Sequence, residues 1–160
     1  MKILNTGGTF NKRYNELSGH MEVPFDNDAL TRMMSSFIES VDMAGVLYKD
    51  SLEFTTDDRK MLASIINADE EKVFIIIHGT DTMELTAEFL DTVFEDRIII
   101  LTGAMKPFEI DRVEASVNFG MALGYVKACK KNGVYICMNG EILPYKELSK
   151  NRSLGKFEIV

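Results

Sequence analysis

The stretch from Val73 to Leu85, which reads VFIIIHGTDTMEL, constrains the fold more than any other part of the chain. Five apolar residues rich in β-branched types lead through a glycine and hydroxyl residues into a helix-like run. Such a pattern is typical of a buried parallel strand followed by a strand-to-helix loop. In open α/β sheets, ligands bind beyond the carboxyl ends of the strands. We therefore expect Thr80 and Asp81 to lie at a functional site.

The same pattern recurs along the chain. Lys2 to Leu4 reads as a first strand that gives way to Asn5-Thr6-Gly7-Gly8-Thr9, so two hydroxyl-bearing loops could meet at one edge of one sheet. Further strands are expected at 41–48, 97–101, 134–138 and 156–160, and helices at about 26–40, 57–67, 83–94 and 111–131. This alternation predicts one α/β domain over residues 1–160, a three-layer fold with a mainly parallel sheet flanked by helices and right-handed crossovers.

Two segments show no clear periodicity. The polar stretch from Phe10 to Pro24 is broken by glycine and is expected to be a mobile connection, and long loops of this kind often act as lids. The segment from Asn139 to Arg152 is expected to form a loop.

Composition narrows the function classes. The formal charge of −7 disfavours nucleic acid as a partner, because such binding needs clustered Lys and Arg, and small neutral or zwitterionic substrates fit better. No apolar run approaches the roughly 18 residues of a membrane span. The chain passes from Met1-Lys2 into a short strand without a signal-peptide pattern, which favours a cytoplasmic location.

The sequence predicts neither a cofactor nor a metal. The spacing of Gly7 and Gly8 matches neither the dinucleotide-binding nor the phosphate-loop pattern. Cys129 and Cys137 lack the paired spacing of a zinc site and are expected to be reduced thiols.

Hydroxyl and carboxylate residues in the loops allow two interpretations each. A threonine hydroxyl becomes a nucleophile only with a base or a relay, and Thr9 could instead make a local turn bond. Thr80 and Asp81 could form a catalytic pair, or they or Thr82 could cap the following helix. His78, alone at the end of a buried strand, is expected to be a satisfied core residue.

Three collinear segments resemble signature segments of the bacterial-type L-asparaginases. They are Asn5-Thr6-Gly7-Gly8-Thr9, the run from Ile77 to Glu84, and the stretch from Leu101 to Pro107. The similarity continues through Asp111 to Asn118 and Met138 to Glu141, and reaches Glu147-Leu148-Ser149-Lys150, which resembles the segment with that family's catalytic lysine. It therefore covers nearly the whole chain.

The resemblance implies roles for individual residues. Thr9 would be the acyl-accepting nucleophile, Thr80 with Asp81 and Lys150 the second hydroxyl relay, and Tyr14 the loop tyrosine that supports the first. Ser51 would contact the substrate carboxylate, the backbone of Ala104 would face the substrate amide, and Gly8 and Gly79 would line the substrate. Backbone N–H groups near Gly8 and Thr80 are the expected oxyanion donors. Leu52 stands where the family usually has a glutamine or serine.

The implied activity is hydrolysis of L-asparagine to L-aspartate and ammonia through an acyl-threonine intermediate. The alternatives are a non-catalytic amino-acid-binding or regulatory module, and a broader amidase or glutaminase. The family's usual second domain, which contributes an acidic residue to a neighbouring site, is not among these residues. A homo-oligomer, a dimer or larger, is expected through the predicted helix 111–131, whose apolar candidates are Val113, Val117, Met121, Leu123 and Val126.

Overall fold

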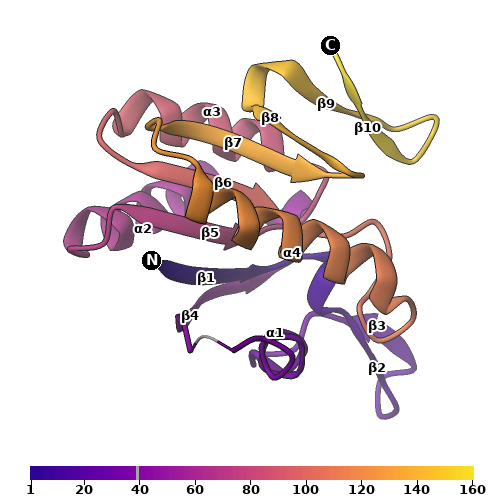
Figure 1. Ribbon diagram of the computed structural model, residues 1–160. Coiled ribbons are helices and arrows are strands. Elements are labelled where there is room, and N and C mark those ends of the chain that lie inside the picture. The colour runs from indigo at the N-terminus through magenta and orange to yellow at the C-terminus, as the bar shows by residue number, and fades with distance from the viewer. Residues whose placement is uncertain (39) are drawn as a thin grey trace.

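A six-stranded sheet forms the centre of the computed structural model, which describes residues 1–38 and 40–160 (Figure 1). The strand order is β4-β1-β5-β6-β7-β8. All neighbouring pairs are parallel except β7 with β8. The strands are β1 (Lys2–Gly7), β4 (Asp42–Lys49), β5 (Val73–Ile77), β6 (Ile98–Thr102), β7 (Gly133–Met138) and β8 (Glu141–Pro144).

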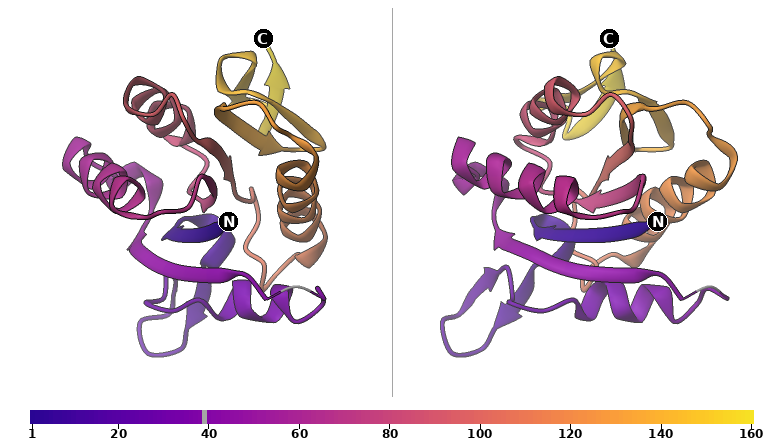
Figure 2. Two further views of the ribbon diagram at one scale, coloured as in Figure 1. Left: turned by 60° about the vertical axis from the view of Figure 1, so that its left-hand side comes forward. Right: turned by 90° about the vertical axis from the view of Figure 1, so that its left-hand side faces the viewer.

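Helices cover both faces of this sheet, which confirms the expected three-layer α/β class (Figure 2). They are α1 (Asp28–Met34), α2 (Thr56–Ala68), α3 (Met83–Val93) and α4 (Arg112–Ala128). Successive strand residues point to opposite faces. Ile75 and Ile77 accordingly pack with α1 and α4, whereas Phe74 and Ile76 pack with α2 and α3. Both faces of β5 are therefore buried, which explains its continuous apolar sequence.

The crossover through α4 departs from the expected handedness. The chain moves in the same direction from β5 to β6 and from β6 to β7, yet α3 and α4 lie on opposite faces (Figures 1 and 2). The β5-α3-β6 crossover is right-handed, so β6-α4-β7 is left-handed, and the prediction of right-handed crossovers throughout is wrong for this unit. The segment after β6 consequently passes over the carboxyl edge of the sheet to reach the other face.

Two small hairpins replace the predicted loops. Strands β2 (Arg13–Asn15) and β3 (His20–Glu22) pair within the segment from Phe10 to Pro24 that was expected to be a mobile connection without regular structure. The segment expected to form a loop before residue 152 contains β8, the 3-10 turn η3 (Tyr145–Glu147) and β9 (Leu148–Asn151). Strand β9 pairs with β10 (Lys156–Ile159), and the hairpin is held because Leu148 and Phe157 are buried in the core beside α3.

Two helices are shorter than expected. Helix α1 ends at Met34 because the N–H groups of Ser36 and Phe37 bond three residues back, and Ile38 is exposed. The predicted end of this helix near Ser40 is therefore wrong. Helix α4 ends at Ala128, where Cys129 turns to an extended conformation toward β7, rather than at Lys131. No helix in the described residues is long and apolar enough to cross a membrane.

Candidate active site

The loops that follow β1 and β5 touch through their glycines. A β-carbon on Gly8 would lie 2.4 Å from the Cα and N atoms of Gly79, and Gly8 has a φ of 75°. A β-carbon on Gly79 would lie 2.5 Å from the Cβ of Ser51, in the loop after β4. Three loops at the carboxyl edge are thus packed together. Thr9 and Thr80 directly follow the two touching glycines, so the expected meeting of the two hydroxyl-bearing loops is confirmed.

Thr9 opens the 3-10 turn η1 (Thr9–Asn11) and is partly exposed. Its carbonyl accepts a hydrogen bond from the Lys12 N–H, but within the described residues its hydroxyl makes none. The hydroxyl of nearby Thr6, by contrast, donates to the Ile77 carbonyl at 2.8 Å. The interpretation of Thr9 as a residue that satisfies a local turn bond is therefore wrong.

Two buried amides fix the turn that carries Thr9. The Asn11 side-chain nitrogen donates to the Asn5 side-chain oxygen at 2.8 Å and to the Gly7 carbonyl at 2.7 Å. The Asn5 oxygen also accepts from the Gly7 N–H at 3.0 Å, and its nitrogen donates to the Asn27 side-chain oxygen at 2.8 Å. Buried and bonded in this way, the amides restrict the geometry of the turn.

Lys150 joins Thr80 and Asp81. Its Nζ donates to the Thr80 hydroxyl and to Asp81 Oδ1, each at 2.8 Å, and its side chain is only 8% exposed. The residue before α3 is Thr82, and neither its side chain nor those of Thr80 and Asp81 cap the helix. The capping alternative is therefore wrong. A largely buried ammonium paired with one carboxylate lies in hydrogen-bond contact with a hydroxyl.

Glu84, in the first turn of α3, places Lys150. Its Oε1 accepts hydrogen bonds from the Lys150 N–H and, at 3.3 Å, from the Ser149 hydroxyl. Asn139 supports the other strand, because its side-chain oxygen accepts from the Phe157 N–H at 2.8 Å. Neither role was found from the sequence. The acidic residue in a helix's first turn was the available signal, but it indicated only a favourable interaction with the helix dipole.

Ser51 connects the β4 loop to the same cluster. It is buried, its hydroxyl accepts from the Asp81 N–H at 3.1 Å, and its carbonyl accepts from the Thr82 hydroxyl at 2.8 Å. Burial acts to raise the pKa of the preceding Asp50, but the hydrogen bonds from Lys12 and the Leu52 N–H and the nearby positive charges, Lys150 included, hold that pKa below its ordinary value. Asp50 is thus ionised near the cluster.

The loop after β6 also packs against the loops at the carboxyl edge of the sheet. A β-carbon on Gly103 would lie 2.4 Å from the His78 carbonyl oxygen, so the β5 and β6 loops also touch. The buried Asn118 of α4 donates to the Gly103 carbonyl at 3.0 Å and accepts from the Asn139 N–H at 3.1 Å. Ala104, the next residue, is fully buried. Its expected backbone contact with a substrate amide stays a prediction.

His78 is a core residue, as expected. It is fully buried, and burial lowers its pKa to about 4, so the ring is neutral at pH 7. Its Nδ1 lies 2.8 Å from the Gly79 carbonyl, and its Nε2 lies 2.9 Å from the Thr86 hydroxyl, which accepts from Arg59 Nε at 3.1 Å. These partners assign the proton to Nδ1. The ring therefore holds the Gly79 carbonyl in place.

Tyr14 is not joined to this cluster. It lies in β2, is 58% exposed, and its hydroxyl makes no hydrogen bond in the part of the chain that the structure describes. Its N–H donates to the Glu109 carboxylate at 3.2 Å. The β2–β3 hairpin, which carries Tyr14, projects from the body of the molecule in Figure 1. Support of Thr9 by Tyr14 is not seen in this conformation.

The Gly8 N–H, one of the expected oxyanion donors, makes a hydrogen bond within the protein. The Gly8 N–H donates to the Lys49 carbonyl at 2.9 Å, so it is tied to β4. The N–H groups of Thr9 and Thr80 make no hydrogen bond within the described residues. The N–H groups of Thr9 and Thr80 are therefore the candidate oxyanion donors in place of the Gly8 N–H.

Known proteins are similar to this chain in both sequence and fold. The family model described as Asparaginase, N-terminal matches residues 1–156. The chain belongs to the asparaginase family. L-asparaginase 2 of Escherichia coli is 38% identical over 97 residues, which are 58% of this chain and 28% of that protein. A glutamyl-tRNA(Gln) amidotransferase component from Methanococcus maripaludis is 32% identical over 152 residues, 88% of this chain and 35% of that protein.

Solved asparaginase structures show the same architecture. The thermostable L-asparaginase from Thermococcus kodakarensis superimposes with a TM-score of 0.84 at 26% identity, over 100% of this chain and 51% of that one. The chain therefore spans about half the length of this asparaginase, and 28% and 35% of the two curated relatives named above.

Proposed function

We propose that this member of the asparaginase family hydrolyses the side-chain amide of L-asparagine to L-aspartate and ammonia through an acyl-threonine intermediate. The observation that carries the proposal is the hydrogen-bonded group of Thr80, Asp81 and Lys150 beside the Gly8–Gly79 contact. This group provides an ammonium, a carboxylate and a hydroxyl next to the loop of Thr9, whose own hydroxyl is free of protein partners within the described residues.

Thr9 would act first. Its hydroxyl oxygen attacks the amide carbon and its proton passes to the departing nitrogen, so that ammonia leaves and an ester remains. The N–H groups of Thr9 and Thr80 would stabilise the negative oxygen of the tetrahedral intermediate. A water molecule then attacks the ester, which releases aspartate and restores the hydroxyl.

The Lys150 group would supply the proton relay. The ammonium beside Thr80 makes it easier for that hydroxyl to give up its proton, because a nearby positive charge stabilises the developing alkoxide. Asp81 holds the ammonium in place through its 2.8 Å contact. Buried surroundings strengthen both interactions, since the local dielectric is low.

The direct test is ammonia release from asparagine by the purified 160-residue chain. We expect turnover that Thr9→Val abolishes and Thr9→Ser partly retains, because serine keeps a hydroxyl. Thr92→Val is the matched control, since the Thr92 hydroxyl is exposed and bonds only the Phe89 carbonyl of its own helix. Absence of turnover at saturating asparagine, or unchanged turnover in Thr9→Val, would contradict the proposal.

A broader amidase or glutaminase is the second candidate. The glutaminase-asparaginase of Pseudomonas aeruginosa is 28% identical over 160 residues, which cover 92% of this chain. One methylene in a pocket changes specificity by only about 1 to 3 kcal/mol. Initial rates on asparagine and glutamine compared at equal concentration separate the two, and a glutamine rate equal to or above that of asparagine would favour the broader activity.

A non-catalytic amino-acid-binding module is the third candidate. Two observations favour it: Leu52 is 73% exposed where the family usually has a polar residue, and Tyr14 is 58% exposed and makes no hydrogen bond to Thr9 within the described residues. Calorimetry with asparagine and aspartate distinguishes this function from an enzyme. Binding without product would support the module.

The cellular compartment is a separate proposal. A solved relative from Campylobacter jejuni is described as a probable cytoplasmic L-asparaginase, and a curated relative from Haemophilus influenzae as probably periplasmic. We propose the cytoplasm for this chain. Fractionation of the source cells is the test, and recovery outside the cytoplasm would contradict it.

A further inference from the structure

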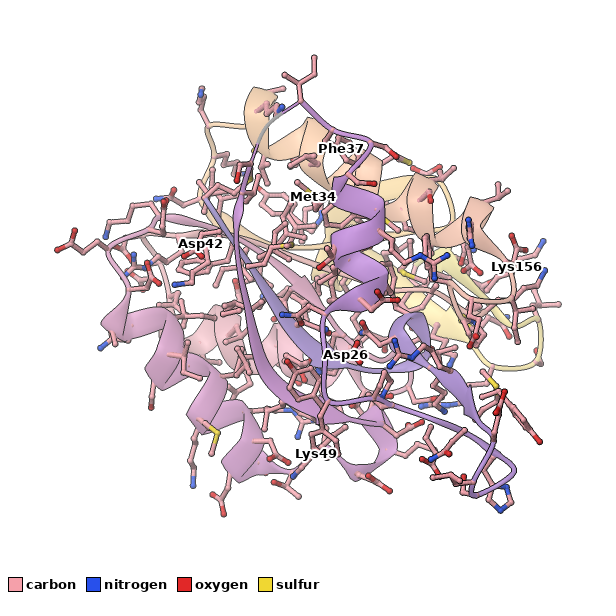
Figure 3. The ribbon with its side chains drawn as sticks, turned by 90° about the horizontal axis from the view of Figure 1, so that it is seen from below. Asp26, Met34, Phe37, Asp42, Lys49 and Lys156 are labelled. Atoms are coloured by element: carbon pink, nitrogen blue, oxygen red, sulfur yellow. The ribbon has the colours of Figure 1, made fainter. Side chains whose placement is uncertain are left out.

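A cleft of about 540 Å³ lies between the end of α1 and the start of α4, on the sheet face opposite α2 and α3. Figure 3 shows α1 beside α4, with Met34 and Phe37 where α1 ends. The volume is within the range of small-molecule sites, which is about 300 to 1,000 Å³. The lining combines cations, hydroxyls and aromatic rings: Arg32, Arg112, Ser35, Ser36, Ser116, Phe37 and Phe108, with Met33. None of these residues takes part in the Thr9 and Thr80 cluster.

The two arginines share one ring. The guanidinium carbons of Arg32 and Arg112 lie 5.7 and 5.5 Å from the centre of the Phe108 ring. Among the described residues, Arg112 has no acidic partner, and Arg32 has only Asp28 at 3.6 Å. Asp28 is itself shared with Arg13 at 3.5 Å. The cleft therefore holds more positive than negative charge, although the whole chain carries −7.

Unpaired hydroxyls add to these donors. The Ser35 hydroxyl donates to the Arg32 carbonyl at 2.7 Å, but those of Ser36 and Ser116 make no hydrogen bond within residues 1–38 and 40–160. A planar guanidinium with neighbouring hydroxyls matches the oxygens of a phosphate or carboxylate group. Because like charges repel, an anion bound between the arginines would also relieve their repulsion.

We propose that this cleft binds a small ligand through an anionic phosphate or carboxylate group, at a site separate from the amide-hydrolysing one. Arg112 is the principal ligand contact, since its guanidinium is committed to no carboxylate among the described residues. Arg32 and Ser116 complete the anion contact, and Phe108 offers an apolar surface to the body of the ligand. The site depends on the left-handed crossover, which brings Phe108 and the start of α4 to the face that carries α1.

Phe108 also connects the cleft to Thr9. Its N–H donates to the Phe10 carbonyl at 3.2 Å, and the two rings stack with centres 6.2 Å apart and planes 19° from parallel. Phe10 directly follows Thr9 in the 3-10 turn. A ligand that moves Phe108 would therefore change the surroundings of Phe10 and shift the amide resonance of Phe10.

The test is a titration of the ¹⁵N-labelled full chain with inorganic phosphate at fixed ionic strength, followed by amide shifts. We expect saturable shifts at residues 35–37, 112–116 and Phe10. Arg112→Gln should weaken binding about tenfold, which is about 1.4 kcal/mol. Lys130→Gln, which removes one charge beyond the end of α4, should leave binding unchanged. Ser116→Ala is a second, milder variant, expected to weaken binding in the same direction.

A parallel titration with succinate distinguishes a carboxylate from a phosphate as the preferred group. Shifts that rise without saturation for both anions, or equal weakening in Arg112→Gln and Lys130→Gln, would overturn the site. A saturable site whose occupation leaves Phe10 unshifted would overturn the connection to Thr9. The amide shifts do not depend on turnover, so they test the anion site independently of the proposed hydrolysis.

Discussion

Gly8 and Gly79 meet backbone to backbone, at a distance that leaves no room for a side chain on Gly8. The contact joins the loop after β1 to the loop after β5, its neighbour in the sheet. It sets the position of Thr9 relative to Thr80, because each threonine is the next residue along. Two residues 71 positions apart thereby bring the candidate nucleophile to the candidate relay.

Gly8→Ala should disrupt this contact. The new β-carbon would meet the backbone of Gly79 at 2.4 Å, and the φ of 75° is one that alanine rarely adopts. We expect a loss of about 3 kcal/mol in the free energy of unfolding, together with loss of turnover. Gly120→Ala is the control: a β-carbon there meets nothing within 4 Å, so α4 should gain about 0.5 to 1 kcal/mol. Chemical denaturation measures both, and equal stabilities of the two variants would contradict the role of the contact.

Lys150→Met should remove the relay and leave the fold in place. We expect kcat for asparagine to fall about 10²- to 10⁴-fold, because the ammonium beside Thr80 is lost. Lys156→Met, in the partner strand of the same hairpin, is exposed and should keep wild-type kcat. Steady-state kinetics with a thermal melt of each variant is the measurement. A Lys150→Met enzyme with wild-type kcat would remove this residue from the mechanism.

His78 should make stability depend on pH. Its pKa is lowered from 6.5 to about 4 in the folded chain, so between these values the unfolded chain binds the extra proton. Stability should be full above about pH 6.5 and fall by about 3 kcal/mol as the pH drops toward 4. His78→Gln should remove this part of the pH dependence, whereas the exposed His20, replaced in the same way, should leave it intact. Identical slopes for the His78 variant and the wild type in denaturation between pH 4 and 8 would contradict the assignment.

The oligomeric state is a further prediction. Val113 and Val117 on α4 are 72% and 47% exposed, but Leu123 and Val126 are buried and Met121 packs against the core, so only the first two can form a contact. We propose a homo-oligomer, most simply a two-fold dimer, that uses this part of α4. Light scattering should give a mass above 18.1 kDa, and Val117→Glu should lower it. A mass of one chain at micromolar concentration would contradict the proposal.

The strands were largely predictable because their signals are local. The apolar run from Val73 to Ile77 is buried on both faces, and such a run has few alternatives in a chain of this length. Thr55 likewise marks the start of α2, because its side chain caps the helix and forms a capping box with Asp58. In these places neighbouring residues determine the backbone, so the sequence is sufficient.

The position of Lys150 and the hand of the α4 crossover were decided by tertiary structure. Both depend on pairings between distant segments: Leu148 and Phe157 must find the core beside α3, and Glu84 must hold the Lys150 backbone. The pair of cations in the cleft cannot be seen in the sequence either, because Arg32 and Arg112 come together only at the ring of Phe108. Apolar periodicity shows that a helix has a buried face but not which face of the sheet it will cover. The sequence alone therefore determined the elements and their reactive loops, and the packing of distant segments decided which side chains meet.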